Sequence, residues 1–428
     1  TACDEDYDIV GRNLAACCAM RGEHSTWLLD DGDNPELAQM ANRLGVGYLT
    51  RKGRKDAKAG NVNAALARTK GDIIALFDID HIPKPSYLER TVGYFSDPRI
   101  GFVQVMPTFA NGGGHGFVAQ AATETSFDFY NPTSLGMDGF DSVTKMGSNS
   151  LIRRSALESI GGYRPGLAED LATSIALHAA GWRSRYVAEP LAPGLAPPDL
   201  AAWFTQQFKW ARGVFEVLLS EYPRLFCHLT WGGRMAYAVR TTKYLVGPVI
   251  FIHLAVIIAI VALGSESALS VLQEYLGHLM PLALMDIIIR HLALRRWHHY
   301  SVATEALWRA IIIIYASWPI YTIAWIMAVL RLPLSFRPTP KNQAIGVNPL
   351  WLLPQLITTL LLIGSILYSM LINEASNQNI LLYLIAFFLA IPQLGLLRPL
   401  LRPRVKSVWN NLMGVNIISD SGNSQGFF

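Results

Sequence analysis

Charged residues are scarce in this sequence. They make up 16% of the 428 residues, whereas hydrophobic residues make up 51%, and soluble domains carry about 25% charged residues. The formal net charge is only +4, which argues against the strongly basic surface of a nucleic-acid-binding protein. The apolar excess is concentrated in residues 244–401. The sequence therefore predicts a globular part followed by apolar segments that are long enough to span a membrane.

Cysteine is also rare, and no pair of cysteines has the CxxC spacing of a zinc site. The four cysteines are Cys3, Cys17, Cys18 and Cys227. We predict free thiols in a reducing compartment, which suits a cytosolic domain. The beginning of the sequence carries no signal-peptide pattern. Its first residues are typical of a loop that follows a strand, so we expect the natural protein to extend further at its N-terminus.

Short apolar runs alternate with helical patterns in the first half of the chain. The apolar runs are residues 25–29, 72–77 and 100–105, and the helical patterns are roughly 8–20, 35–44, 61–69 and 85–95. This alternation predicts an α/β domain with a mostly parallel sheet and helices on both faces. Sheets of this kind bind ligands outside the carboxyl ends of their strands.

Two of the predicted strands end in aspartates. Asp30 and Asp31 follow the first run, and Asp78 and Asp80 follow the second. Two carboxylates separated by one residue can converge on one Mg²⁺ or Mn²⁺, which prefers oxygen ligands and shared phosphates. Acidic residues after strands also cap helices and form turns. For Asp30 and Asp31 the sequence does not decide between these two roles.

Three further motifs have both a functional and a structural interpretation. Lys58 stands in Lys-Ala-Gly-Asn at the start of a predicted helix, which suits phosphate binding or an ordinary basic loop. Asp170 follows Glu169 at another helix start, where it is either a cap or a general base. Trp210, in Gln-Gln-Phe-Lys-Trp on an amphipathic helix, either stacks on a sugar ring or packs in a core.

The order of these motifs resembles that of the cellulose synthase catalytic subunit. More broadly it resembles the processive family-two glycosyltransferases, including curdlan and hyaluronan synthases. A further segment, Phe336–Lys341, resembles the gating-loop motif of cellulose synthases. The resemblance covers essentially the whole chain. It implies an α/β nucleotide-sugar-binding domain of the GT-A type followed by an α-helical transmembrane bundle.

The resemblance also implies a role for each matching residue. Asp170 would be the catalytic base, and Glu169 and Trp210 would meet the acceptor. Asp78 and Asp80 would bind the metal, Mg²⁺ or Mn²⁺. The donor, UDP-glucose, would be held by Thr1, Asp31, Lys58, Asp78, Gln206, Lys209, Phe336, Thr339 and Lys341.

In function, the resemblance implies a processive inverting glycosyltransferase that polymerises a β-glucan and translocates it through its own channel. The enzyme would be an integral protein of the plasma or inner membrane with its catalytic domain in the cytosol. Its partners would be the nucleotide-sugar, the growing polysaccharide, the lipid bilayer and an accessory export subunit, with no nucleic acid. The alternatives are a non-processive membrane glycosyltransferase that acts on a lipid carrier, and a pore subunit whose globular domain is inactive.

The sequence departs from the usual family motifs at four positions. Ala168 replaces a threonine, Gln207 and Lys209 replace arginines, and Pro338 replaces a valine. Lysine is not equivalent to arginine where two hydrogen bonds to phosphate are needed. Because of these departures, the sequence does not decide whether the glycosidic linkage of the product is β-1,4 or β-1,3.

Hydropathy and charge predict the arrangement of the chain in the membrane. Four segments are predicted to span: 244–264, 269–292, 350–372 and 379–401. Segment 307–330 is equally apolar, but if it crossed, the gating loop would lie on the side opposite the catalytic domain. We therefore predict that it lies at the interface. The expected domains are a GT-A domain with its interfacial helix at 1–225, a channel region at 226–406 with an interfacial segment 301–335 and gating loop 336–342, and a tail at 407–428.

Overall fold

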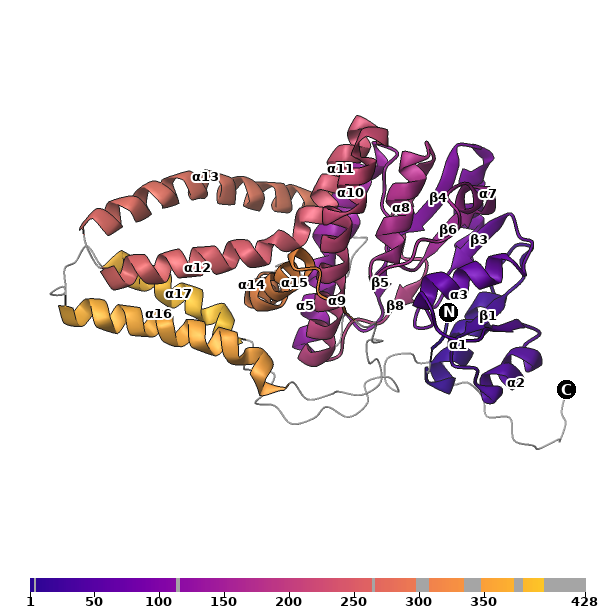
Figure 1. Cartoon of the computed structure of the whole chain (residues 1–428), viewed down its shortest axis with the longest axis horizontal. Helices are drawn as coiled ribbons and strands as arrows, with labels where there is room; N and C mark the ends of the chain where they lie inside the picture. Colours follow the sequence, from indigo (N-terminus) through magenta and orange to yellow (C-terminus); the bar gives the residue numbers. More distant parts are fainter. Residues whose placement is uncertain are drawn as a thin grey trace, which may run out of the picture.

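The computed structural model describes residues 1–3, 5–112, 116–263, 266–297, 308–334, 348–372 and 380–395. Figure 1 shows three zones along its long axis. A globular α/β part lies on the right and contains the N-terminus, a group of steep helices stands in the middle, and long helices extend to the left. The chain thus combines an α/β domain with a helical bundle, as its sequence predicts.

The globular part alternates strands and helices in chain order. Its first elements are α1 (Tyr7–Cys18), β1 (Trp27–Asp30), α2 (Pro35–Arg43), β2 (Gly47–Thr50), α3 (Ala57–Leu66), β3 (Ile73–Leu76), α4 (Tyr87–Thr91), η1 (Val92–Ser96), β4 (Ile100–Val105) and β5 (Thr108–Phe109). These are followed by α5 (Phe117–Asp128), η2 (Phe129–Thr133), α6 (Ser134–Asp138), β6 (Ser150–Arg153), α7 (Arg154–Ser159), α8 (Glu169–Ala179), β7 (Arg183–Val187) and β8 (Pro193–Gly194). Each of the three predicted runs overlaps a strand, and each of the four predicted helical patterns overlaps a helix.

The central sheet is mixed. Its four strands lie in the order β3-β6-β4-β7, with β4 and β7 parallel. Strand β6 lies between β3 and β4 and is antiparallel to both. The pairs β1–β2 and β5–β8 are parallel. The expectation of a mostly parallel sheet missed β6, because its four residues contain only two apolar side chains and give no clear strand signal.

Helix α8 lies between two hydrophobic cores. On one side its Leu177 packs with Phe102 of β4. On the other side its Ile175 packs with Phe215 of α9 (Leu200–Leu219). Figure 1 shows α8 between the sheet and the steep helices. Helix α8, which begins with Glu169 and Asp170, is therefore held by both parts of the molecule.

The second half of the described chain is helical. Its elements are α10 (Glu221–Leu225), η3 (Phe226–His228), α11 (Trp231–Thr242), η4 (Lys243–Leu245), α12 (Val246–Leu263), α13 (Glu266–Trp297), α14 (Trp308–Ala316), α15 (Trp318–Val329), η6 (Pro349–Leu352), α16 (Leu353–Ile372) and α17 (Ile380–Gly395). Within the described ranges, three helices are long and apolar enough to cross a membrane, namely Trp231–Ala262, Gln273–Ala293 and Leu350–Ile372. These helices make the chain a membrane protein. The fourth predicted segment, 379–401, corresponds to α17, whose described apolar stretch Tyr383–Leu394 is shorter.

Helices α14 and α15 form a bent pair in the region of the predicted interfacial segment 307–330. The axes of the two helices differ in direction by 46°. A pair bent in this way forms either one broken membrane span or a re-entrant loop. Helix α15 packs against α9 and α12, and α14 packs against α5. At the bend, Ser317 accepts a hydrogen bond from Trp203 Nε1 at 3.0 Å, and Tyr321 donates to Gln207 at 3.1 Å. The bent pair is thus bonded to α9. That it lies at the interface without crossing stays a prediction.

Glu124 of α5 holds the N-terminal end of α14. Its side chain is buried, with 3% of the residue exposed. The carboxylate accepts hydrogen bonds from the backbone N–H of Arg309 at 3.0 Å and of Ala310 at 3.1 Å, and from Arg309 Nη1 at 2.6 Å. One carboxylate therefore satisfies two of the N–H groups that a helix start leaves without partners and also pairs with a guanidinium.

We expect Glu124→Ala to lower the stability of the protein by about 2–4 kcal/mol, because it leaves Arg309 and two helix N–H groups unpaired. Thermal unfolding of the detergent-solubilised protein measures this as a lower midpoint. Glu158→Ala, which removes a carboxylate from the short helix α7, is the matched control. Equal midpoints for the two variants would show that the Glu124 contact does not stabilise the junction.

Candidate functional site

Asp30 has a structural role at the end of β1. Its buried carboxylate accepts hydrogen bonds from the backbone N–H of Gly32 at 2.7 Å and of Asn34 at 2.8 Å. The hydroxyl of Tyr48 donates to it at 2.9 Å. These contacts fix the turn after the strand, so the structural interpretation of the Asp-Asp-Gly motif holds for its first residue.

Asp31 lies at the same end of β1 and is held by an arginine. Arg51 donates from Nε to Oδ1 at 2.6 Å and from Nη2 to Oδ2 at 2.8 Å. Arg51 also donates to the carbonyl of Ala57 at 2.8 Å, at the start of α3. The amino group of Thr1 donates to the carbonyl of Phe77 at 3.2 Å. Thr1 and Asp31 therefore lie at the edge of the domain where β1 and β3 end.

Lys58 and Asp78 form an ion pair at this edge. Lys58 Nζ donates to Asp78 Oδ1 and to the carbonyl of Gly147 at 2.6 Å. The backbone N–H of Asp78 donates to Ser148 Oγ at 2.9 Å. Burial lowers the pKa of Lys58, but Asp78 and other nearby carboxylates raise it by more, so that its pKa lies above the ordinary value. Lys58 is thus a half-buried ammonium whose charged form is stabilised by the neighbouring carboxylates.

Asp80 lies next to this pair in sequence. It is buried, with 6% of the residue exposed, and its Oδ1 lies 3.4 Å from Nδ1 of His81. Among the described residues, no group of three or more histidine, cysteine, aspartate or glutamate side chains could hold a metal ion. A divalent cation here would need oxygens from a ligand in addition to Asp78 and Asp80. This donor set fits Mg²⁺, which proteins commonly hold with one or two carboxylates and substrate phosphates.

Glu169 and Asp170 begin α8 beside the lysine–aspartate pair. An ideal Cβ at Gly147, whose carbonyl accepts from Lys58, would lie 3.8 Å from Asp170 Oδ2. Burial and the charge of Asp170 raise the pKa of Glu169 to about 7, against the opposing effects of Lys58 and Lys209. Two carboxylates and two ammonium groups therefore act on each other in one small volume.

Helix α9 brings the remaining predicted residues to the site. Burial lowers the pKa of Lys209, and the site carboxylates oppose that shift. Trp210, the next residue, is 37% exposed. Gln206 is half-buried, whereas Gln207 is buried and bonded to Tyr321. The predicted gating-loop residues lie outside the described part of the chain: Phe336, Thr339 and Lys341.

Sequence reasoning missed a segment that organises this site, residues 145–150. Besides the contacts of Gly147 and Ser148, the backbone N–H of Met146 donates to Gln104 Oε1 at 2.9 Å, and Gln104 Nε2 donates to the carbonyl of Ser148 at 2.9 Å. Gly147 has a φ of +82° and Asn149 one of +55°, a region that glycine and asparagine tolerate. The available signal was the Gly-Ser-Asn sequence at residues 147–149, since these residue types are typical of turns.

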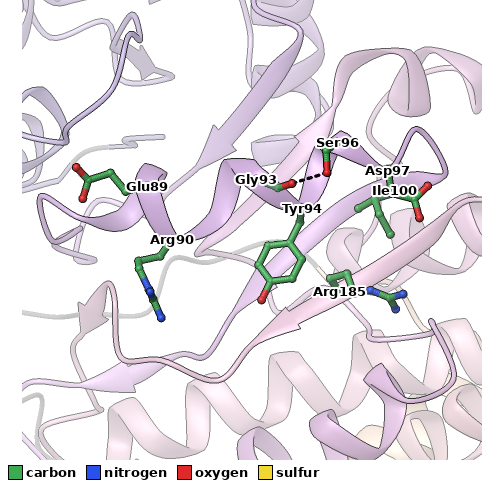
Figure 2. Close-up of a pocket in the computed structure, with 8 residues that line it drawn as sticks. All are labelled: Glu89, Arg90, Gly93, Tyr94, Ser96, Asp97, Ile100 and Arg185. Atoms are coloured by element: carbon green, nitrogen blue, oxygen red, sulfur yellow. Dashed lines mark hydrogen bonds between the residues drawn. The ribbon is translucent and has the colours of Figure 1, made fainter.

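Figure 2 shows a different hollow, formed by α4, η1, the start of β4 and a residue of β7. It has a volume of about 350 Å³ and is lined by Glu89, Arg90, Gly93, Tyr94, Ser96, Asp97, Ile100 and Arg185. Its charges are already paired, Arg90 with Glu189 and Asp97 with Arg99. The only bond drawn between the labelled residues joins Ser96 Oγ to the Gly93 carbonyl. None of the predicted site residues lines it.

Two family profiles match this chain. The profile described as "Glycosyltransferase like family 2" matches residues 2–213, and the profile described as "Cellulose synthase" matches residues 154–331. Together they cover the globular part, the bent pair and two of the candidate spans. All the described residues of the candidate site lie inside one or both matches, except Thr1.

Curated relatives point to the same family. Cellulose synthase 1 of Komagataeibacter xylinus is 34% identical over 223 residues, which are 51% of this chain and 14% of the relative. The UDP-forming cellulose synthase catalytic subunit of Pseudomonas fluorescens (strain SBW25) is 31% identical over 297 residues, which are 65% of this chain and 39% of the relative. The chain thus spans well under half the length of these relatives.

Among solved structures, the fold is similar to that of a mannosyltransferase from Pyrobaculum calidifontis in complex with GDP-Man and Mn²⁺. The TM-score is 0.46 at 13% identity, covering 77% of this chain and 85% of the mannosyltransferase. The family-two match and the mixed sheet with its helices agree with a GT-A type domain. The globular part of this chain, residues 2–213, matches the family-two glycosyltransferases, and the chain is similar to the cellulose synthase catalytic subunit.

Proposed function

We propose that this protein is a processive inverting glycosyltransferase that polymerises a β-glucan from UDP-glucose and moves it through its own membrane channel. One observation carries the proposal. Two lysines and three carboxylates, all predicted site residues, gather at the sheet edge beside α9: Lys58, Lys209, Asp78, Glu169 and Asp170. Relatives named UDP-forming cellulose synthases support UDP as the leaving group.

The described residues divide into groups suited to the parts of a nucleotide-sugar. Thr1 and Asp31 would meet the nucleotide base, at the end of β1. Lys58, Lys209 and Gln206 would border the diphosphate, whose charge the two ammonium groups stabilise. Asp78 and Asp80 would hold Mg²⁺ or Mn²⁺, which when bound offsets negative charge on the departing diphosphate. The predicted contacts from the gating loop would complete this set: Phe336, Thr339 and Lys341.

Asp170 would act as the general base. Its carboxylate takes the proton from a hydroxyl of the terminal sugar of the acceptor. The hydroxyl oxygen forms a bond to the anomeric carbon while the bond from that carbon to UDP breaks, and the electron pair leaves with UDP. Attack from the side opposite the leaving group converts an α-linked donor into a β-linkage. No covalent intermediate with the protein is needed.

The acceptor would run from the site toward the membrane helices along α9. Trp210 would stack on the acceptor sugar, since an exposed indole offers an apolar face, and Glu169 would lie beside it. Helix α9 is bonded to the bent pair at Ser317 and Tyr321, and α15 packs on α12. The product would therefore pass directly from the catalytic domain (residues 1–225) into the channel region (226–406).

In a cell, the catalytic domain would face the cytosol, where nucleotide-sugars are made. The membrane would be the plasma or inner membrane, and an accessory subunit would guide the polymer on the far side. The short connection between the second pair of predicted spans carries Glu374 and no lysine or arginine. A short connection without positive charge favours the outer side, which supports this orientation.

Product analysis tests the proposal. We expect detergent-solubilised protein, given radiolabelled UDP-glucose with Mg²⁺ or Mn²⁺, to make an insoluble polymer that a β-1,4- or a β-1,3-glucanase digests. The sensitive digestion identifies the linkage. Label that instead moves into organic solvent would indicate transfer to a lipid carrier and would contradict processive synthesis. The absence of any transfer from UDP-glucose, while another nucleotide-sugar supports it, would contradict the donor assignment.

A further inference from the structure

A second cavity lies where the loop before α8, helix α9 and the end of α15 meet. It has a volume of about 810 Å³, and small-molecule sites typically occupy about 300–1,000 Å³. Its walls include residues 164–168, the C-terminal half of α9 and residues 328–333. The described residues that line it include none of the predicted site residues.

Arginines dominate the charge of this cavity. Arg164, Arg212 and Arg331 all line it. Arg212 is buried, with 3% of the residue exposed, and its Nη2 donates to the carbonyl of Leu332 at 2.9 Å. The Nε atoms of Arg164 and Arg212 are buried as well, and neither has a hydrogen-bond partner in the described part of the chain. Because a buried donor without an acceptor is costly, a ligand that supplies acceptors to these atoms would bind favourably.

The carboxylates of the lining do not neutralise all of this charge. Glu216 Oε1 lies 2.7 Å from Arg212 Nη1, and Glu221 pairs with Arg224, which is not a lining residue. No described carboxylate lies within ion-pair distance of the other two lining arginines. The cavity therefore has two guanidinium groups without a described counter-charge.

Arg331 also has an unusual backbone conformation. Its φ is +53°, in the left-handed region that glycine usually occupies at the end of a helix. Its N–H donates to the carbonyl of Ala328 at 3.1 Å, and the N–H of Leu332 donates to that of Met327 at 3.0 Å. A strained arginine at a position suited to glycine indicates that its guanidinium has a role.

The lining has an apolar side as well. Val217 of α9 is buried, whereas Leu219 and Val329 expose 44% and 50% of their surface. Val329 ends α15, which belongs to the bent pair predicted to lie at the membrane interface. Basic pockets beside membrane helices suit the headgroups of anionic lipids.

We propose that this cavity binds a phosphate group through Arg164 and Arg331, and that its apolar side favours a phospholipid as the carrier of that phosphate. A guanidinium group can donate two parallel hydrogen bonds to phosphate oxygens. The buried Nε of Arg212 would find its acceptor in the same ligand.

A ligand in this cavity would contact the segment that leads to the candidate site. An ideal Cβ on Gly213 of α9 would lie 2.8 Å from the backbone nitrogen of Ala168 and 2.9 Å from the carbonyl carbon of Leu167. Ala168 directly precedes Glu169 and Asp170. Binding should therefore change the rate of glucosyl transfer; this consequence rests on the proposed function, whereas binding itself does not.

Calorimetric titration of the detergent-solubilised protein tests the site, with short-chain phosphatidylglycerol, short-chain phosphatidylcholine and inorganic pyrophosphate as probes. Arg164→Met keeps the side-chain length and removes the charge, and Arg331→Gly removes the charge and suits the backbone. Arg21→Met, at an exposed arginine paired with Glu89, is the control. We expect phosphatidylglycerol to bind wild type and the control alike, and each cavity variant about 10- to 100-fold more weakly, because hydrogen bonds to a charged group are lost.

Thermal unfolding shows whether the variants are folded, and Arg331→Gly should unfold at or above the wild-type midpoint. Equal phosphatidylglycerol affinity in wild type and in both cavity variants would overturn the inference, as would wild-type protein that binds neither phosphatidylglycerol nor pyrophosphate. Pyrophosphate binding that both cavity variants weaken, without a preference for phosphatidylglycerol over phosphatidylcholine, would support the phosphate site and assign it to a soluble ligand.

The rate of glucosyl transfer is the second readout. In nanodiscs, wild-type activity should depend on phosphatidylglycerol, and the variant with both substitutions should lose this dependence. A dependence that the double variant keeps would overturn the link to catalysis. Wild-type protein that binds phosphatidylglycerol through these arginines but transfers no sugar would contradict the proposed function and leave the phosphate site intact.

Discussion

An Asp170→Asn variant should lose about 10²- to 10⁴-fold in kcat, the contribution that a positioned general base typically makes. Asparagine keeps the size of the side chain and its oxygen, which accepts from the Leu171 N–H at 2.8 Å. It cannot take a proton from the acceptor hydroxyl. Since the change leaves the lysines that would meet the diphosphate in place, KM for UDP-glucose should change by no more than about threefold, as expected when only transition-state stabilisation is lost.

Steady-state kinetics with radiolabelled donor measures both parameters. Asp97→Asn is the matched control, because it is the same substitution at an exposed carboxylate paired with Arg99. This control should retain wild-type kinetics. Substantial transferase activity in Asp170→Asn would remove Asp170 from the role of base and leave Glu169 as the nearest candidate.

Replacing Asp78 by asparagine should lower kcat/KM by about 10²- to 10³-fold. The Lewis-acid contribution of a bound metal amounts to several kcal/mol, and each ~1.4 kcal/mol corresponds to a factor of ten in rate. The variant also takes away the partner that keeps the pKa of Lys58 above its ordinary value. Burial then opposes the charged form of Lys58 with one carboxylate fewer to offset it, so the pKa of Lys58 should fall.

Titration of the rate with Mg²⁺ and with Mn²⁺ distinguishes this loss from that of Asp170→Asn. Asp78→Asn should need more metal for half-maximal activity, whereas Asp170→Asn should need the same amount as wild type. Chelation should abolish wild-type activity, and added metal should restore it. Asp72→Asn, at the opposite end of β3, is the control. Unchanged metal dependence in Asp78→Asn would contradict the assignment of Asp78 as a ligand.

Local patterns predicted much of the fold. The strands at 72–77 and 100–105 and the helices near 8–20 and 35–44 follow from the pattern of apolar residues. The structure adds the cap of α1, where the Asp6 side chain accepts from two N–H groups. Strand β6 could not be predicted in the same way. It is four residues long, and its place between β3 and β4 depends on contacts with residues distant in sequence.

The candidate site, too, could be predicted only in part from the sequence. The order of the motifs predicts that Lys58, Asp78 and Asp170 lie in one site. It could not show that Asp31 is held by Arg51, nor that Gln104 holds the segment 145–150. Both facts depend on which side chains meet in three dimensions, and a single arginine or glutamine carries no periodic signal.

The bent pair is hydrogen-bonded to α9, which carries two residues of the candidate site. The position of these residues should therefore depend on the thickness of the surrounding bilayer. Trp203 and Gln207, which hold the bend, stand on the same helix as Lys209 and Trp210. A lipid layer thinner or thicker than the apolar length of the spanning helices makes them tilt, and α15 packs against one of them, α12. Hydrophobic mismatch should therefore shift α9 and change the rate of transfer even when substrate and metal are saturating.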